Sequence, residues 1–242
     1  MSYVQNKNAT MRMHTSAFTS DEYKYIRCTT VDGGNQLQVF TSLFYPRNTL
    51  LPVLGVDLLQ FNHGKKTLCI VDFQPVVIPS SSIENNDDDT ITITKNHEYY
   101  ESKLKQIRDQ YPSLQNEMTN RFYSSDDPYF SKQMLLGRIQ HDSKAKSIDD
   151  TKTATYDLVY NDLYPAYRQY VRTHVQLQKE ALQQQQEQNA HEMQYVQECH
   201  AKYDTYSAER DPAHKLLGNI FGQEFADDYV YDVLFPAATR KV

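Results

Sequence analysis

The sequence predicts a three-layer α/β/α sandwich built on a central antiparallel β-sheet. Three observations point to this fold class. The first third of the chain contains short strand patterns in succession, joined by tight turns, which is typical of antiparallel sheets. One of these strands carries bulky side chains on both faces, so both faces of the sheet are expected to be covered. Helical patterns come mostly later in the chain, and helices there can supply the two outer layers.

The strand patterns are bounded by turn residues. Residues 22–27 lead to the turn signal DGGN at 32–35. Residues 36–45 alternate Leu, Val, Thr and Leu on one face with Gln, Phe, Ser and Phe on the other. Residues 57–61 end at an Asn-His-Gly turn, and the run KKTLCIVDFQ at 65–74 is the clearest strand signal in the chain. We therefore expect consecutive hairpins.

Less regular segments flank these strands. Residues 1–16 are polar and lack a pattern, so we expect a frayed terminus. Residues 79–96 contain serines, asparagines and three consecutive aspartates, which indicates a solvated loop insertion. A short helix is predicted over 98–111, and a strand that carries Arg138 near its end is predicted over 129–139.

Helices dominate the last third of the chain. Apolar and aromatic residues recur at helical spacing from Tyr156, with Pro165 starting or kinking that helix. A second helix is predicted over 191–208, followed by the joint Asp211-Pro212 and a short helix. The 242 residues are enough for one domain or two small ones with a proper core, and we expect a single domain over 1–242.

Composition excludes several classes of function. The formal net charge of −6 argues against general affinity for nucleic acid. There is no run of 18 apolar residues that could span a membrane, and no secretory signal is visible. The three cysteines form neither a disulfide framework nor a redox pair, which favours a reducing compartment. His191, Cys199 and His200 do not have the spacing of a zinc site, so we expect no metal.

Three aspartates stand at unusual positions. Asp57 and Asp72 interrupt strand patterns, and a carboxylate on a covered strand costs several kcal/mol unless it is satisfied. Asp211 precedes a proline, which holds it at a helix break. The simplest interpretation of Asp211 is a helix N-cap, because Asp followed by Pro is a common helix start. Asp72 is assigned to structure, since its motif resembles a strand end.

Several motifs together resemble those of the ferredoxin-dependent bilin reductases, which reduce biliverdin and its dihydro derivatives to phytobilins. They occur in the same order and at compatible spacing over about residues 22–236. The matching stretches are VDGGNQLQV at 31–39, YP at 45–46, LPVLGVDL at 51–58, VDFQP at 71–75, YFSKQMLLGR at 129–138, PAY at 165–167, YDTYSAERDPAH at 203–214, FGQEFA at 221–226 and VLF at 233–235.

The resemblance implies roles for individual residues. Asp57 matches the family's proton donor on a central strand, and Asp211 matches its second, helix-borne aspartate. Arg138 matches the arginine that pairs with a substrate propionate, a carboxylate that arginine binds bidentately. Thr41 stands where the phycocyanobilin-forming members carry a catalytic histidine, and the phytochromobilin-forming plant enzymes lack the acid at Asp57. The phycoerythrobilin pathway remains, in which a first enzyme takes biliverdin to 15,16-dihydrobiliverdin, a second takes that product to phycoerythrobilin, and a phage-type enzyme does both. The substrate is therefore expected to be biliverdin or 15,16-dihydrobiliverdin, and the run at 33–39 leans slightly toward the first enzyme.

The resemblance also implies how the reaction is supplied. The bilin accepts single electrons from reduced ferredoxin, an external donor, and the enzyme binds no flavin, metal or nicotinamide. Carboxylic acids with raised pKa values would deliver the protons, and tyrosines and phenylalanines would enclose the bilin. Ferredoxin is acidic, so docking requires a local basic patch on this acidic chain. The candidates are Lys65, Lys66, Arg168, Arg172, Lys215, Arg240 and Lys241.

Further expectations follow from the same comparison. The chain begins almost inside the family's fold, which suggests an incomplete gene product, and no plastid transit peptide is visible. We expect a monomer, located in the plastid stroma if the source is eukaryotic and in the cytoplasm if it is cyanobacterial or phage. Two rivals stay open. A bilin carrier on this fold would keep Arg138 and the aromatic residues without needing both acids, and a non-catalytic remnant would keep the motifs but fold poorly.

Overall fold

A single antiparallel sheet organises the molecule. The computed structural model describes residues 2–6, 10–78, 88–117, 127–140, 153–184 and 190–240. Seven strands lie side by side in the order in which they occur in the sequence, each antiparallel to the next. They are β1 (Ser2–Gln5), β2 (Arg12–Phe18), β3 (Tyr23–Asp32), β4 (Leu37–Pro46), β5 (Val53–Phe61), β6 (Lys66–Gln74) and β7 (Leu135–Gln140).

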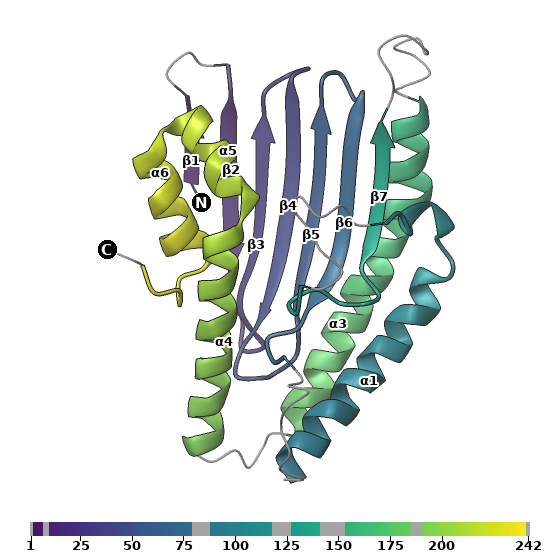
Figure 1. Cartoon of the computed structure of the whole chain (residues 1–242), viewed down its shortest axis with the longest axis vertical. Helices are drawn as coiled ribbons and strands as arrows, with labels where there is room; N and C mark the ends of the chain where they lie inside the picture. Colours follow the sequence, from purple (N-terminus) through teal and green to yellow (C-terminus); the bar gives the residue numbers. More distant parts are fainter. Residues whose placement is uncertain are drawn as a thin grey trace.

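Helices cover both faces of this sheet, so the predicted three-layer sandwich is confirmed. In Figure 1, α4 to α6 lie over the β1–β3 side, and α1 and α3 lie toward β7. The helices are α1 (Asp88–Arg108), the short 3₁₀ turn η1 (Pro112–Leu114), the π-helix η2 (Asp157–Leu163), α3 (Tyr164–Gln184), α4 (Ala190–Arg210), α5 (Pro212–Phe221), α6 (Gln223–Asp228) and the π-helix η3 (Tyr229–Leu234).

The register of the strands determines which residues share a face. Directly paired residues of an antiparallel sheet point to the same side. Thr29, Thr41, Asp57 and Ile70 therefore form one row across β3 to β6. Leu43, two residues beyond Thr41 on the same side of β4, is buried in the cluster formed with α4, α5, α6 and η3. We call this side of the sheet the α4–α5 face.

The other side of the sheet packs against α1, α3 and η2, and we call it the α1–α3 face. Leu54 and Val56 of β5 are buried there with Leu104 of α1 and Tyr170 of α3. The strand interior is therefore covered on both sides, as the bulky pattern of residues 36–45 predicts. An amphipathic helix on each face removes this apolar surface from water, the dominant favourable term in folding.

Three boundary predictions are wrong. Residues 2–5 and 12–18 form β1 and β2 instead of a frayed end. Polar side chains obscure the alternation there, but Met13 and Thr15 point inward and β2 pairs with β3. Residues 88–96 belong to helix α1 and not to a loop; a run of aspartates in a sequence is as typical of a helix start as of a solvated loop. The other residues of the predicted insertion, 79–87, lie outside the described residues.

The third correction concerns residues 129–134, which are turns instead of strand. Side-chain bonds hold this segment in place. The Ser131 amide donates to Asp72 Oδ2 at 3.2 Å, and the Ser131 hydroxyl donates to Glu101 Oε1 at 2.9 Å. The Gln133 amide donates to the Ser131 hydroxyl at 2.8 Å. The strand β7 therefore starts only at Leu135.

A buried histidine attaches α3 to the sheet. His174 is 0% exposed; its Nε2 lies 2.8 Å from the carbonyl oxygen of Pro52 and its Nδ1 lies 2.9 Å from the hydroxyl of Tyr23. These partners define the tautomer, with Nε2–H donating to Pro52 and Nδ1 accepting from Tyr23. Burial lowers the pKa of His174 to about 4, so the ring is neutral at physiological pH.

We predict that His174→Leu destabilises the fold and also changes its acid sensitivity. Two buried polar groups lose their partner, which costs about 3 kcal/mol. In the wild type, the lowered pKa stabilises the fold fully above the unfolded value of 6.5. This contribution is lost as pH falls toward the folded value, by about 2 kcal/mol at pH 5. Urea unfolding at pH 7 and pH 5 measures both effects.

The matched control for this experiment is His191→Leu on the exposed side of α4. It should leave both the unfolding free energy at pH 7 and its pH dependence close to wild type. If His174→Leu loses as much stability on acidification as the wild type does, the acid sensitivity has another source.

Candidate active site

Asp57 lies in the middle of the sheet, at the point on β5 where the residues become less buried. It stands on β5 between Thr41 of β4 and Ile70 of β6, on the α4–α5 face. The first four residues of β5 are buried, whereas Asp57 and the residues after it are only half-buried. The side chain therefore sits at the border between the packed core and the half-buried residues that follow it on the same face of β5. We call this less covered part of the face the open strip.

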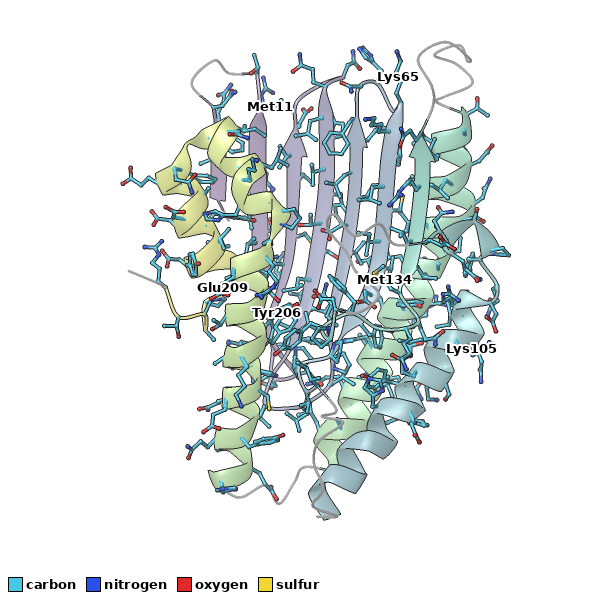
Figure 2. All side chains as sticks on the ribbon, viewed as in Figure 1. Met11, Lys65, Lys105, Met134, Tyr206 and Glu209 are labelled. Atoms are coloured by element: carbon cyan, nitrogen blue, oxygen red, sulfur yellow. The ribbon has the colours of Figure 1, made fainter. Side chains whose placement is uncertain are left out.

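This open strip separates two packed regions. On one side is the core formed with α4, in which Tyr206 is partly buried. On the other is a small cluster of Ile70, Met134 and Leu136 beside β7. Figure 2 labels Tyr206 of the first region and Met134 of the second. At its lower end, the Tyr206 hydroxyl donates to Asp127 Oδ2 at 3.0 Å and thereby links α4 to the turn before β7.

The carboxyl of Asp57 is poised to hold a proton near neutral pH. Desolvation by the surrounding protein and, to a smaller extent, the nearby carboxyl of Asp211 together raise its pKa to about 7. The guanidinium of Arg27 opposes this shift. A carboxylic acid with such a pKa can donate a proton at neutral pH and recover it from solvent.

Asp211 combines two properties that the sequence presents as alternatives. It is the N-cap of α5, with φ −63° and ψ 116°, and its Oδ1 accepts the amide of Ala213 at 2.7 Å; Pro212 occupies the first turn. Burial nevertheless raises its pKa, although the bond from Ala213 and the charges of Arg27 and His214 counteract this. The cap fixes the direction of the carboxyl, and its field reaches Asp57. The structure thus brings together two aspartates more than 150 positions apart.

Arg27 is a charged residue near both acids that the sequence patterns do not single out. It is 6% exposed and lies on β3, on the α4–α5 face. Its Nη1 donates to the carbonyl oxygen of Val233 in η3 at 3.2 Å. The alternation of Tyr23, Tyr25, Arg27, Thr29 and Val31 contains a signal for it, because it places a cation among inward-facing positions.

Arg138 lies on the same face but farther toward the sheet edge. It is exposed on β7 and pairs with Leu68, one row beyond that of Asp57. Its backbone amide donates to Asn116 Oδ1 at 2.7 Å, which fastens β7 to the segment after η1. Two strand spacings separate β5 from β7, roughly 10 Å. The structure therefore does not bring Arg138 into contact with the acids, but it leaves the distance of an extended ligand between them.

Asp72 and Asp204 are buried acids beside this region. Asp72 is 0% exposed; burial holds its pKa well above the usual range, and it accepts the Ser131 amide. Asp204 on α4 accepts the Tyr45 hydroxyl at 2.9 Å and the Ala237 amide at 3.0 Å. Burial raises the pKa of Asp204 to about 6. Both residues attach loops to the core, which agrees with the structural assignment of Asp72.

A groove of about 500 Å³ lies on the opposite, α1–α3 face and includes none of the predicted site residues. Phe40 and Leu58 from the sheet, Tyr160 from η2 and Tyr156 just before η2 contribute to its walls. Within the part of the chain that the structure describes, no group of three or more His, Cys, Asp or Glu residues could hold a metal ion. None of the described helices combines the length and apolarity needed to cross a bilayer.

Comparisons with known proteins agree on one family. The sequence model of the family described as ferredoxin-dependent bilin reductase matches residues 1–236. The 15,16-dihydrobiliverdin:ferredoxin oxidoreductase of Gloeobacter violaceus is 30% identical over 222 residues, covering 91% of this chain and 77% of that protein. The protein of the same name from Synechococcus sp. (strain CC9605) is 32% identical over 216 residues, covering 89% and 78%.

The fold is also found in a solved structure. The crystal structure of phytochromobilin synthase from tomato in complex with biliverdin superposes with a TM-score of 0.72 at 16% sequence identity. The alignment covers 98% of this chain and 73% of that one. At this identity the likeness establishes the fold alone.

We predict that Asp211→Asn lowers the pKa of Asp57. Asparagine caps a helix as well as aspartate does, so α5 should keep its start. The negative charge that raises the pKa of Asp57 is removed, so this pKa should fall below about 7. The carboxyl band of Asp57, followed by infrared spectroscopy over a pH series, measures the shift.

Asp211→Ala is the comparison that separates the cap from the charge. It also removes the charge, but it loses the bond to the Ala213 amide and should cost about 1 kcal/mol in urea unfolding. An Asp57 pKa that stays the same in both variants would mean that the two carboxyls do not interact.

Proposed function

Because the chain belongs to the ferredoxin-dependent bilin reductase family, we propose that it reduces biliverdin to 15,16-dihydrobiliverdin, with Asp57 and Asp211 as the proton donors. The pair of acids carries this proposal. Reduction of a bilin by single electrons needs protons at defined carbons, and Asp57 is a carboxyl whose pKa lies near 7 beside a second acid. The curated relatives that bear the name 15,16-dihydrobiliverdin:ferredoxin oxidoreductase support the choice of substrate.

The general reaction follows from the family. The protein is an oxidoreductase that carries out ferredoxin-dependent reduction of bilins in phytobilin biosynthesis. The family uses reduced ferredoxin as an external electron donor and no bound prosthetic group. In the proposed reaction, two reduced ferredoxins each give one electron, and two protons complete the saturation of one carbon–carbon double bond.

The arrangement of the acids suggests an order of events. The first electron makes the bilin more basic, and Asp57 gives its proton to a carbon of the bilin and becomes a carboxylate. The second electron is followed by a second proton, supplied by Asp211. Both carboxylates regain protons from solvent across the half-buried strip. Asp57 points from a rigid central strand and Asp211 is held by its cap, so neither donor has to be reorganised before the reaction.

Arg138 has the role of substrate anchor in this proposal. The propionate side chains of a bilin are carboxylates, which a guanidinium binds bidentately. A tetrapyrrole that contacts Asp57 at its centre would extend across β6 and reach β7, where Arg138 stands on the same face. Thr41, the direct partner of Asp57, has no acidic side chain. In this proposal the two aspartates therefore supply both protons.

The pathway, the oligomeric state and the cellular location of the protein are also proposals. The phycoerythrobilin pathway, of which this reaction would be the first step, is supported by Thr41 and by Asp57. A monomer is proposed, in the plastid stroma of a eukaryote or in the cytoplasm of a cyanobacterium or a phage host. Gel filtration and product chromatography against authentic bilins test these points.

We predict that Asp57→Asn binds biliverdin but reduces it slowly or not at all. The amide keeps the size of the side chain but has no acidic proton, and loss of a general acid costs about 10²–10⁴-fold. The bound-bilin absorbance should remain, and a reduced, unprotonated radical should persist after reduced ferredoxin is added. Absorbance and electron paramagnetic resonance measure the two states.

Asp211→Asn and Asp72→Asn complete that experiment. Asp211→Asn should also bind bilin but stall at a different intermediate or give a different isomer, because its proton reaches another carbon. Asp72→Asn should affect stability more than turnover, since Asp72 holds the turn before β7. If the Asp57 and Asp211 variants turn over like the wild type, the acids are structural.

Exposure and position on the sheet favour Lys65 and Lys66 among the basic candidates for ferredoxin docking. Lys65 and Lys66 are exposed at the turn between β5 and β6, and Lys66 pairs with Gln140 of the strand that carries Arg138. Arg168, Arg172 and Lys215 are also exposed. Arg240 is paired with Asp228 at 2.8 Å, and Lys241 lies outside the described residues. The two lysines therefore stand at the same end of the sheet as the proposed substrate anchor.

We predict that turnover falls steeply with rising ionic strength, because screened charges steer an acidic donor less. Lys65→Glu/Lys66→Glu should raise the KM for ferredoxin about tenfold or more at low salt and should flatten the salt dependence. Lys179→Glu/Lys202→Glu, at exposed positions on α3 and α4, is the charge-matched control and should retain the wild-type KM. Equal effects of the two reversals would place docking elsewhere.

A further inference from the structure

Arg27 is a buried cation without a matching anion. Its side chain is 6% exposed, and guanidinium groups keep their charge in proteins. Within the described residues, its one hydrogen bond goes to the carbonyl oxygen of Val233 and its Nε is buried without a partner. No carboxylate of the described part of the chain forms an ion pair with it at 4.0 Å or less. Such a group is costly to bury, so the uncompensated charge requires an explanation.

The position of Arg27 relates this charge to the proposed reaction. It pairs with Leu43, and Leu43 pairs with Gly55, so its row lies next to the row of Thr41 and Asp57 on the same face. Only the strand β4, with Leu43 and Thr41, lies between Arg27 and Asp57, so the two charges interact across one strand. The field of Arg27 also reaches Asp211 at the start of α5, where it favours the ionised carboxylate. One cation thus acts on both proposed proton donors.

We propose that Arg27 is a positioning residue whose fixed positive charge compensates the negative charge that the site acquires during bilin reduction. This inference rests on the function proposed above. When one electron passes from reduced ferredoxin to the bilin, the site gains one negative charge. When Asp57 then gives its proton to the bilin, that charge moves to the Asp57 carboxylate. Arg27 stabilises both states without giving up a proton, and its effect disappears only when solvent reprotonates the acid.

Other titratable groups face the same region, and the variants must leave these groups unchanged. They are Tyr25 of β3, Asp204 of α4, the N-cap Asp211 and His214 of α5. Lys24 acts on Asp204 and is not among the charges that shift the pKa of Asp57. Of these groups, only Arg27 is a cation that acts on both Asp57 and Asp211.

A purely structural role would be to attach η3 to β3 through Val233. Arg27→Gln compared with Arg27→Lys separates the two roles, because both replacements keep an N–H donor on a shorter side chain but only lysine keeps the charge. Arg47→Gln is the matched control, since Arg47 donates to the carbonyl oxygens of Ser20 and Tyr23 at 3.1 and 3.2 Å and acts on neither acid.

The first measurement uses the substrate-free protein. The carboxyl band of Asp57 is followed by infrared spectroscopy over a pH series in the wild type and the three variants. In Arg27→Gln the pKa of Asp57 should rise, because a charge that lowers it is gone. Arg27→Lys should change it less, and Arg47→Gln should leave it unchanged. An unchanged value in Arg27→Gln would overturn the inference, whatever the protein reduces.

The second measurement is the pH profile of bilin reduction with reduced ferredoxin. The protonated acid is the donor, so activity falls as pH rises through its pKa. In Arg27→Gln this descending limb should move to higher pH while the maximal rate falls about 10²-fold, the usual effect of losing one electrostatic group at a reacting centre. A lower rate with an unmoved limb would assign Arg27 to structure.

Two further outcomes remain informative. If Arg27→Gln does not fold, Arg27→Lys decides: an unmoved limb supports the inference, and a limb shifted upward contradicts it. If the wild type reduces no bilin, the proposed function is wrong, and the infrared titration still tests the effect of Arg27 on Asp57.

Discussion

The candidate site depends on the register of β4 against β5. Thr41 is paired with Asp57, and this pairing directs the carboxyl toward the face covered by α4 and α5. A slip of one residue would turn every side chain of β5 to the other face. Asp57 would then lie among the leucines and aromatic rings packed on α1 and α3, where no second acid or arginine of the site is near. The apolar residues on both faces of β4 and β5 prevent such a slip, because each face is buried against its own helices.

A second constraint is the start of α5. The N-cap bond from Ala213 and the fixed φ of Pro212 determine where Asp211 points. One carboxyl thus satisfies a helix end and contributes a charge to the site. The two functions compete in their effect on its protonation, because the cap bond favours the charged form and burial favours the neutral form. The raised pKa shows that burial has the larger effect.

Tyrosine hydroxyls attach the helices to the sheet at several places. The Tyr229 hydroxyl lies 3.0 and 2.7 Å from the hydroxyls of Thr15 and Thr29, which fixes η3 over β2 and β3. Tyr45 bonds to Asp204 of α4, and Tyr170 of α3 donates to the carbonyl oxygen of Gln133 at 2.7 Å. Each ring is buried as an apolar body while its polar tip finds a partner. Many of the 19 tyrosines therefore serve the architecture that positions the site.

The sequence by itself determined the elements whose signal is local. Alternation and turn residues define β3 to β6, helical spacing defines α3 and α4, and Asp211-Pro212 defines the start of α5. Ordered motifs indicate the family, and with it Asp57, Asp211 and Arg138 as candidates. Local signals were insufficient where polar residues form strands, as in β2, or where side-chain bonds convert an apparent strand into turns, as at Ser131. The motifs also predict that Asp57 and Asp211 face one region, but the tertiary structure alone decided that the carboxyl at 211 is both a helix cap and a charge that acts on Asp57. It also decided that Arg27 carries an unpaired charge beside them, because burial and the distance between charges exist only after the chain has folded.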